Sequence, residues 1–141
     1  MWLFTVGGFL SAVEERRGEH RGEIVVRARE ASALEALREV APTLTETVIY
    51  SDTDYRYRAW LGREEWAQAL AELGRRVDYP NYKSAVLARQ GPTPFEEALH
   101  EVWSAMGRTQ PGGPYGSGGG GYPPVPEGEE ARPRASGRAD A

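Results

Sequence analysis

The chain has no cysteine among its 141 residues, and its basic side chains are almost all arginine. Without cysteine there is no disulfide framework, no thiolate nucleophile and no cysteine-ligated zinc or iron–sulfur site. Lys83 is the single lysine beside sixteen arginines. An arginine-rich composition is typical of a GC-rich genome. The alternative is that position 83 needs a compact ammonium group whose pKa the protein can adjust.

Long apolar runs are also missing from the sequence. No segment approaches the roughly 18 to 20 consecutive apolar residues that a membrane-spanning helix needs. Residues 1–6 are apolar, but no basic residues precede them and Gly7-Gly8 follows, so they predict a strand rather than a signal peptide. We therefore expect a soluble, cytoplasmic protein that does not bind membranes.

The net charge of −4 limits the classes of partner. Non-specific affinity for nucleic acid depends on an excess of Lys and Arg. The acidic balance argues against a generic nucleic-acid binder, and it leaves room for a local basic patch.

The composition changes sharply near residue 108. Residues 109–141 are rich in glycine and proline and contain almost nothing that a core would bury, so we predict a disordered tail there. Residues 1–108 are predicted to form a single domain. A domain of this size can bury a hydrophobic core without disulfides or metals.

Alternation of apolar and polar residues predicts four strands in two hairpins. The predicted strands cover residues 2–13, 23–29, 46–50 and 55–61. In the first of them we interpret Gly7-Gly8 as a bulge. The charged, glycine-containing segment 14–22 is predicted to be the turn of the first hairpin.

A helical period of 3.6 residues follows each predicted hairpin. The predicted helices cover residues 32–41, 63–77 and 94–106, with a brief helical turn at 81–86. Ser32 and Glu35 have the spacing of a capping box, as do Thr93 and Glu96. The last helix carries one apolar stripe, which we expect to face the core. The sequence thus predicts an α+β fold, specifically a ferredoxin-like sandwich with a four-stranded antiparallel sheet and a C-terminal helix.

Strand alternation places four arginines and a tryptophan on the sheet face that the helices leave uncovered. These residues are Arg27, Arg29, Arg56, Arg58 and Trp60. The placement assumes that Tyr55, Tyr57 and Ala59 face the helices. Such a face can hold an anion or stack against a base. The alternative is a ladder of ion pairs with carboxylates of the neighbouring segments.

The segment Asp78–Lys83 is a second candidate site. It places a carboxylate, two phenols, an amide and the single ammonium on a loop that a proline stiffens. The residues concerned are Asp78, Tyr79, Asn81, Tyr82 and Lys83. The alternative is a structural role, with the tyrosines packed on the core and Asp78 and Asn81 capping backbone groups.

Known catalytic and metal-binding patterns are missing from the sequence. His20 has no evident partner, and His100 has only Glu96 and Glu97 at helical spacing, which cannot complete a metal shell. There is no phosphate-binding loop, dinucleotide fingerprint or Gly-x-Ser-x-Gly motif. We therefore expect no metal and no cofactor, and we assign no catalytic residue.

Several short motifs together resemble a family of small uncharacterised bacterial and phage proteins. The motifs are Met1–Thr5 with Gly8, Phe9 and Ser11, then Arg27–Arg29, Asp54–Arg58, Asp78–Lys83 with Ala85 and Val86, and Val102–Met106. The resemblance implies a compact domain of unknown function that stands alone, with no residue roles to carry over.

The sequence favours a non-enzymatic binding or interaction module. The arginine-bearing face and the segment Asp78–Lys83 would hold a small anionic ligand or a protein partner. One alternative is a small enzyme in which Lys83 acts as a base or electrostatic stabiliser. Another is a homodimer that covers the open sheet face.

Overall fold

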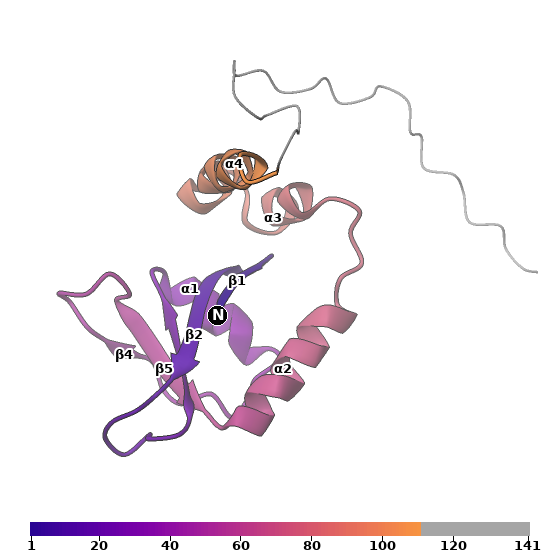
Figure 1. Ribbon diagram of the computed structural model, residues 1–141. Helices are drawn as coiled ribbons and strands as arrows, with labels where there is room; N and C mark the ends of the chain where they lie inside the picture. The colour runs from indigo at the N-terminus through magenta and orange to yellow at the C-terminus, as the bar shows by residue number, and fades with distance from the viewer. Residues whose placement is uncertain (111–141) are drawn as a thin grey trace, which may run out of the picture. The chain divides into compact units, whose positions relative to one another are not determined.

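In the part of the chain that the computed structural model describes, residues 1–110, five antiparallel strands form one sheet in the order β1-β2-β3-β5-β4 (Figure 1). The strands are β1 (Trp2–Thr5), β2 (Gly8–Glu14), β3 (Ile24–Ala28), β4 (Val48–Ile49) and β5 (Tyr57–Leu61). The helices in the same part of the chain are α1 (Ala31–Arg38), α2 (Arg63–Arg75), α3 (Tyr82–Gln90) and α4 (Pro94–Gly107). The tail predicted over residues 109–141 lies outside the described residues, apart from its first two.

The predicted α+β class is confirmed, but the prediction of four strands is wrong and a ferredoxin-like topology is not shown. Gly7 belongs to a tight turn, not to a bulge, so the strand predicted over residues 2–13 is a hairpin in which Thr5 lies opposite Gly8. The Thr5 hydroxyl holds the turn. It accepts a hydrogen bond from Gly7 N at 3.1 Å and donates one to Gly8 O at 3.1 Å.

Helix α1 packs closely against this turn because the two glycines have no side chain. A Cβ atom on Gly7 would lie 2.5 Å from the Cβ of Ala36, and one on Gly8 would lie 2.7 Å from the Cβ of Ala33. Gly8 also has a φ of +138°, which side-chain-bearing residues rarely adopt. The Gly-Gly pair therefore serves both the chain reversal and the helix contact.

The hydrophobic core lies between one face of the sheet and helices α1 and α2. The strands contribute alternate residues to it, as the period of two predicts. Central members of the core are Leu10, Ala12, Val26, Ala28, Ala59, Leu61, Leu34, Leu37, Trp66 and Ala69. No helix residue of this core cluster packs on the opposite face of the sheet, which we call the open face.

The observed starts of the helices match only some of the predicted N-caps. Helix α1 begins one residue before Ser32, with Glu30 at the N-cap position and no side-chain cap, so the predicted capping box is not formed. The cap of α3 is confirmed, since Asn81 Oδ1 accepts a hydrogen bond from Ser84 N at 3.0 Å. Helix α3 is longer than the predicted turn and continues to Gln90.

Helix α4 begins as predicted, with Glu96 N donating to the Thr93 hydroxyl at 3.3 Å. The prediction that its apolar stripe faces the core is wrong. Leu99 is its one fully buried residue, whereas Val102 is 36% exposed and Trp103 is 39% exposed. Helical periodicity identifies an apolar face, but it does not determine what covers that face.

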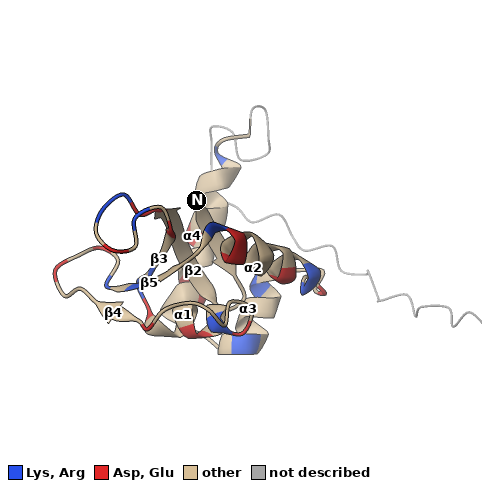
Figure 2. Cartoon of the chain, turned by 90° about the horizontal axis from the view of Figure 1, so that it is seen from below, with Lys and Arg blue, Asp and Glu red and all other residues tan. Residues whose placement is uncertain are grey.

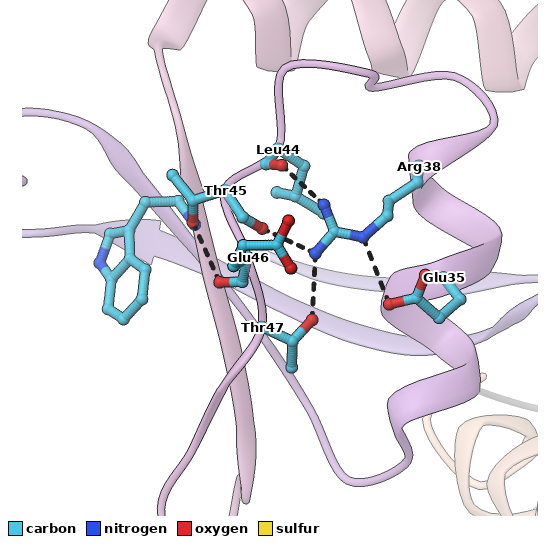
Figure 3. Close-up of polar contacts among 7 residues, drawn as sticks. Glu35, Arg38, Leu44, Thr45, Glu46 and Thr47 are labelled. Carbon is cyan, nitrogen blue, oxygen red and sulfur yellow. Dashed lines mark hydrogen bonds and ion pairs between the residues drawn. The ribbon is translucent and has the colours of Figure 1, made fainter.

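Arg38 of α1 holds the irregular segment that leads to β4 (Figure 3). Its guanidinium donates hydrogen bonds to Leu44 O at 2.6 Å, to Thr45 O at 2.7 Å and to the Thr47 hydroxyl at 3.1 Å. Thr45 in turn pairs with Trp60, because Thr45 N donates to Trp60 O at 2.9 Å and Trp60 N donates to the Thr45 hydroxyl at 2.9 Å. The chain therefore already lies alongside β5 at Thr45, before the two-residue strand β4 begins.

Among residues 1–110, no helix has both the length and the apolar character that a membrane span requires.

Candidate functional site

Arg27 and Arg58 lie on the open face, where the strand register aligns them, and Arg29 joins them over the Tyr55 ring. Arg56 is exposed and precedes the first residue of β5. One row of side chains crosses all five strands, each residue directly opposite the next. The row consists of Trp2, Ser11, Arg27, Arg58 and Val48. Arg27 and Arg58 are therefore direct cross-strand neighbours, a like-charge arrangement that destabilises a sheet unless something compensates.

Tyrosine rings support the guanidinium groups on this face. The guanidinium carbon of Arg27 lies 4.7 Å from the ring centroid of Tyr55, and that of Arg29 lies 5.4 Å from the same ring. Arg58 lies 4.6 Å from the ring centroid of Tyr50. Such cation–π contacts are worth roughly 0.5 to 1 kcal/mol each at exposed sites. They fix the planes of the guanidinium groups without neutralising their charge.

The position of Tyr55 corrects the sequence analysis, which placed it toward the helices. Its ring lies on the open face beside Arg27 and 6.2 Å from the ring of Phe9, and it is 5% exposed. The expected alternation fails because β5 begins only at Tyr57. Before it the chain turns, with the Thr53 hydroxyl donating to Tyr55 O at 2.7 Å.

The predicted alternative of a salt-bridge ladder is not observed. Within residues 1–110, no carboxylate forms an ion pair with Arg27, Arg29, Arg56 or Arg58. Arg27 donates to the Ser11 hydroxyl at 2.8 Å, while its buried Nε has no hydrogen-bond partner among the described residues. Figure 2 shows basic residues next to β3 and β5, and both basic and acidic residues along the β2–β3 loop. The open face is thus locally basic although the chain is acidic.

Trp60 belongs to this face, but its ring is covered. The imidazole of His20 stacks on it at a centroid distance of 4.7 Å, and only 7% of Trp60 is exposed. The indole N–H donates to a Glu15 carboxylate oxygen at 3.3 Å. The β2–β3 loop therefore closes over Trp60, and a ligand cannot stack on this ring while the loop is in place.

The same contacts shift the titration of Glu15. Hydrogen bonds from the backbone N–H of Arg17 and from the Trp60 indole, together with the positive charge of Arg58, hold the pKa of Glu15 below its usual value. Glu15 therefore stays ionised to lower pH than an isolated glutamate and keeps its contact with Trp60.

An aromatic cluster on β1 and β2 was missed in the sequence analysis. Phe4 and Phe9 lie opposite each other with ring centroids 4.8 Å apart, and Trp2 meets Phe9 edge-on at 5.6 Å. Trp2 is 70% exposed. The alternation of Trp2 and Phe4 was visible in the sequence. Its relation to Arg27 depends on the pairing of β2 with both neighbours.

The segment Asp78–Lys83 does not join the open face. Asp78 and Tyr79 line a cavity of about 840 Å³ with Leu3 of β1, Leu37 of α1 and Leu73 of α2, on the helix-covered side of the sheet. Arg27 and Arg58 lie on the other side. The sheet thus separates the two groups of predicted site residues.

The structural alternative is confirmed for two residues of this segment. Asn81 caps α3, and Tyr82 donates from its hydroxyl to Thr5 O at 2.9 Å. Burial, with a smaller effect of Tyr79, raises the pKa of Tyr82 well above its usual value. Tyr82 therefore anchors α3 to the β1–β2 turn as a neutral phenol.

Lys83 lies on α3 rather than in a loop. Its Nζ is 5.1 Å from the ring centroid of Trp103 and 3.5 Å from His100 Nδ1, and His100 Nε2 is 3.1 Å from a Glu96 oxygen. Lys83 does not line the cavity. Residues 1–110 contain no group of three or more His, Cys, Asp or Glu side chains placed to hold a metal ion.

Comparison of the chain with family models, with curated proteins and with solved structures finds no match. The resemblance to small uncharacterised bacterial and phage proteins stays a prediction that rests on the short motifs alone.

Proposed function

We propose that the chain is a non-enzymatic binding module that holds an anionic ligand, or an anionic segment of a protein partner, on its open face. The residues responsible are Arg27, Arg29, Arg56 and Arg58. One observation carries the proposal. Arg27 and Arg58 lie opposite each other on adjacent strands, and Arg29 shares the Tyr55 ring with Arg27. No carboxylate of residues 1–110 forms an ion pair with any of the four arginines.

An anion on this face would relieve the like-charge contact between Arg27 and Arg58. The tyrosines contact the flat sides of the guanidinium groups, and Arg58 Nε donates to Tyr55 O at 3.5 Å. The N–H groups of Arg29 and the terminal N–H groups of Arg58 are left for a ligand. Hydrogen bonds from arginine to an ionised oxygen are roughly twice as strong as neutral ones. The face therefore has more to gain from a multiply charged anion than from a neutral molecule.

The proposal does not use the segment Asp78–Lys83. Asp78 and Tyr79 remain predicted ligand-binding residues of a separate site at the cavity. The small-enzyme alternative with Lys83, the cytoplasmic location and the homodimer likewise stay predictions.

Heparin affinity chromatography of the full-length chain tests the proposal, with the sulfated polysaccharide as the anionic probe. We expect retention at low salt and early elution of the Arg56→Gln/Arg58→Gln variant. The matched control is Arg75→Gln/Arg76→Gln, which removes two arginines whose partner Glu72 lies on α2. Circular dichroism confirms that both variants fold. If the two variants elute together, or if the unmodified chain is not retained, the open face is not an anion-binding site.

A further inference from the structure

The open face has two chemically different halves that meet without a gap. The aromatic half, on β1 and β2, consists of Trp2, Phe4 and Phe9. The cationic half, on and next to β3 and β5, consists of Arg27, Arg29 and Arg58. Tyr55 joins them, since its ring lies 6.2 Å from the ring of Phe9 and 4.7 Å from the Arg27 guanidinium.

The register places the two halves side by side rather than end to end. Trp2 on β1 and Arg58 on β5 belong to the same row, three strand spacings apart. At about 4.8 Å per spacing this separation is roughly 14 Å. Stacked nucleotides rise about 3.4 Å each, so a short single strand of about four nucleotides covers the distance.

The exposure of Trp2 is the second observation. Burying a large apolar side chain stabilises a protein, yet Trp2 is 70% exposed. Its neighbours Phe4 and Phe9 are only half-buried. Trp2, supported by these two rings, offers flat aromatic surface beside arginines that form no ion pair within residues 1–110.

We infer that the open face binds single-stranded nucleic acid, with a base stacked on Trp2 and phosphates held by the cationic half. This inference rests on the proposed function and specifies its ligand. Every base has a π face that can stack on an aromatic side chain. Guanidinium groups match phosphate oxygens in geometry and charge.

The net charge of −4 sets the strength of binding rather than excluding it. Several acidic side chains are engaged with arginines away from the face, as Glu39 is with Arg76 and Arg89. Three or four phosphate contacts on a single strand give a salt dependence with a slope of about −2 to −3 in log K against log salt concentration. We therefore expect weak binding that disappears above moderate salt.

Two other ligands of similar charge fit the face less well. In a duplex the bases are stacked inside the helix, so the aromatic half cannot reach their faces. An acidic peptide engages the cationic half alone and leaves Trp2 without a role. The single strand is the ligand class that uses both halves together.

Fluorescence anisotropy with the full-length chain at 50 mM salt tests the inference. The probe is a labelled 12-nucleotide oligo(U), compared with an abasic oligonucleotide of the same length and charge and with a 12-base-pair duplex. We expect oligo(U) to bind most tightly. Trp2→Ala is expected to weaken oligo(U) binding by roughly tenfold or more, because about 1.4 kcal/mol of lost stacking corresponds to a factor of ten. Arg29→Gln/Arg58→Gln is expected to reduce the salt slope by about 1.4, at about 0.7 per lost phosphate contact.

Ile49→Ala serves as the matched control for Trp2→Ala, since Ile49 is 63% exposed and lies opposite Tyr57, a core-face residue. It should leave binding unchanged. Circular dichroism and thermal melting show whether each variant folds.

The outcomes separate this inference from the proposed function. Equal binding of oligo(U) and the abasic strand, or no effect of Trp2→Ala, overturns nucleic-acid recognition and leaves anion binding intact. If Arg56→Gln/Arg58→Gln loses heparin retention but the unmodified chain does not bind oligo(U), nucleic-acid recognition is again overturned and anion binding is kept. A preference for the duplex also overturns the inference. A stable dimer in size-exclusion chromatography that Trp2→Ala dissociates would assign the face to a second copy of the chain.

Discussion

Gly8 shows at the scale of single residues how a side chain can be excluded for two independent reasons. Its φ of +138° is unfavourable for any residue with a Cβ, and an added Cβ would lie 2.7 Å from the Cβ of Ala33. We predict that Gly8→Ala lowers the free energy of unfolding by about 3 kcal/mol, the sum of backbone strain and overpacking. Thermal denaturation measures this loss. Gly18→Ala is the control, since Gly18 has a φ of +69° but nothing within 4 Å, and it should cost only about 1 kcal/mol. Equal costs for the two variants would show that the helix contact does not matter.

Arg38 makes a contact that lysine cannot replace. Its planar guanidinium reaches Leu44 O, Thr45 O and the Thr47 hydroxyl at once. We predict that Arg38→Lys lowers the free energy of unfolding by about 1 to 3 kcal/mol, because at least one partly buried carbonyl loses its donor. Urea denaturation provides the measurement. Arg63→Lys is the control, because Arg63 forms an exposed ion pair with Glu14. It should change the free energy of unfolding by less than about 1 kcal/mol. A comparable loss in both variants would contradict the special role of Arg38.

At the scale of elements, the β2–β3 loop is held on the open face by the contacts of Glu15 and His20 with Trp60. The pKa of Glu15 is lowered in the folded state, so its ionised form contributes stability that is present above the ordinary glutamate value of 4.5 and is lost as pH falls through the lowered pKa. We predict that the indole N–H resonance of Trp60 shifts with a midpoint below pH 4.5. Nuclear magnetic resonance follows this signal, and Glu15→Gln should make it independent of pH in that range. A midpoint above 4.5 would argue against the contact.

Helix α3 and helix α1 form a matched pair for testing caps. Asn81 caps α3 through Ser84 N, whereas Ser32 lies inside α1 and caps nothing. We predict that Asn81→Ala costs about 1 kcal/mol and that Ser32→Ala changes the free energy of unfolding by no more than about 0.5 kcal/mol. Chemical denaturation of both variants provides the comparison. The reverse order would mean that the sequence pattern at Ser32 describes the helix start better than the structure does.

At the scale of the whole molecule, burial is concentrated in the sheet and α1. Four of the five residues of β3 are buried, while α3 and α4 contain one buried residue each, Val86 and Leu99. Regions with few buried contacts open at lower free-energy cost. We predict slow amide hydrogen exchange in β2, β3 and β5, and exchange at least tenfold faster in α3 and α4. Hydrogen–deuterium exchange with mass spectrometry measures this, and uniform protection across both groups would contradict it.

Sequence patterns predicted the elements better than their arrangement. The helix predicted over residues 63–77 is observed over Arg63–Arg75. The Asn81 and Thr93 caps and the hairpin leading to β5 also follow from local chemistry, and they too were predicted. The number of strands was wrong, because Gly7-Gly8 is compatible locally with a bulge or with a turn. Only the packing of Ala33 and Ala36 on those glycines distinguishes the two.

For the candidate site, too, some features were predictable from the sequence and others depended on the tertiary structure. Strand alternation, with Val26 and Ala59 assigned to the helix-covered side, put Arg27 and Arg58 on one face. Tertiary structure alone decided that no carboxylate of residues 1–110 pairs with them, that the loop covers Trp60, and that Trp2 shares their row. Cross-strand register and loop closure depend on contacts between residues distant in sequence. No local pattern contains that information.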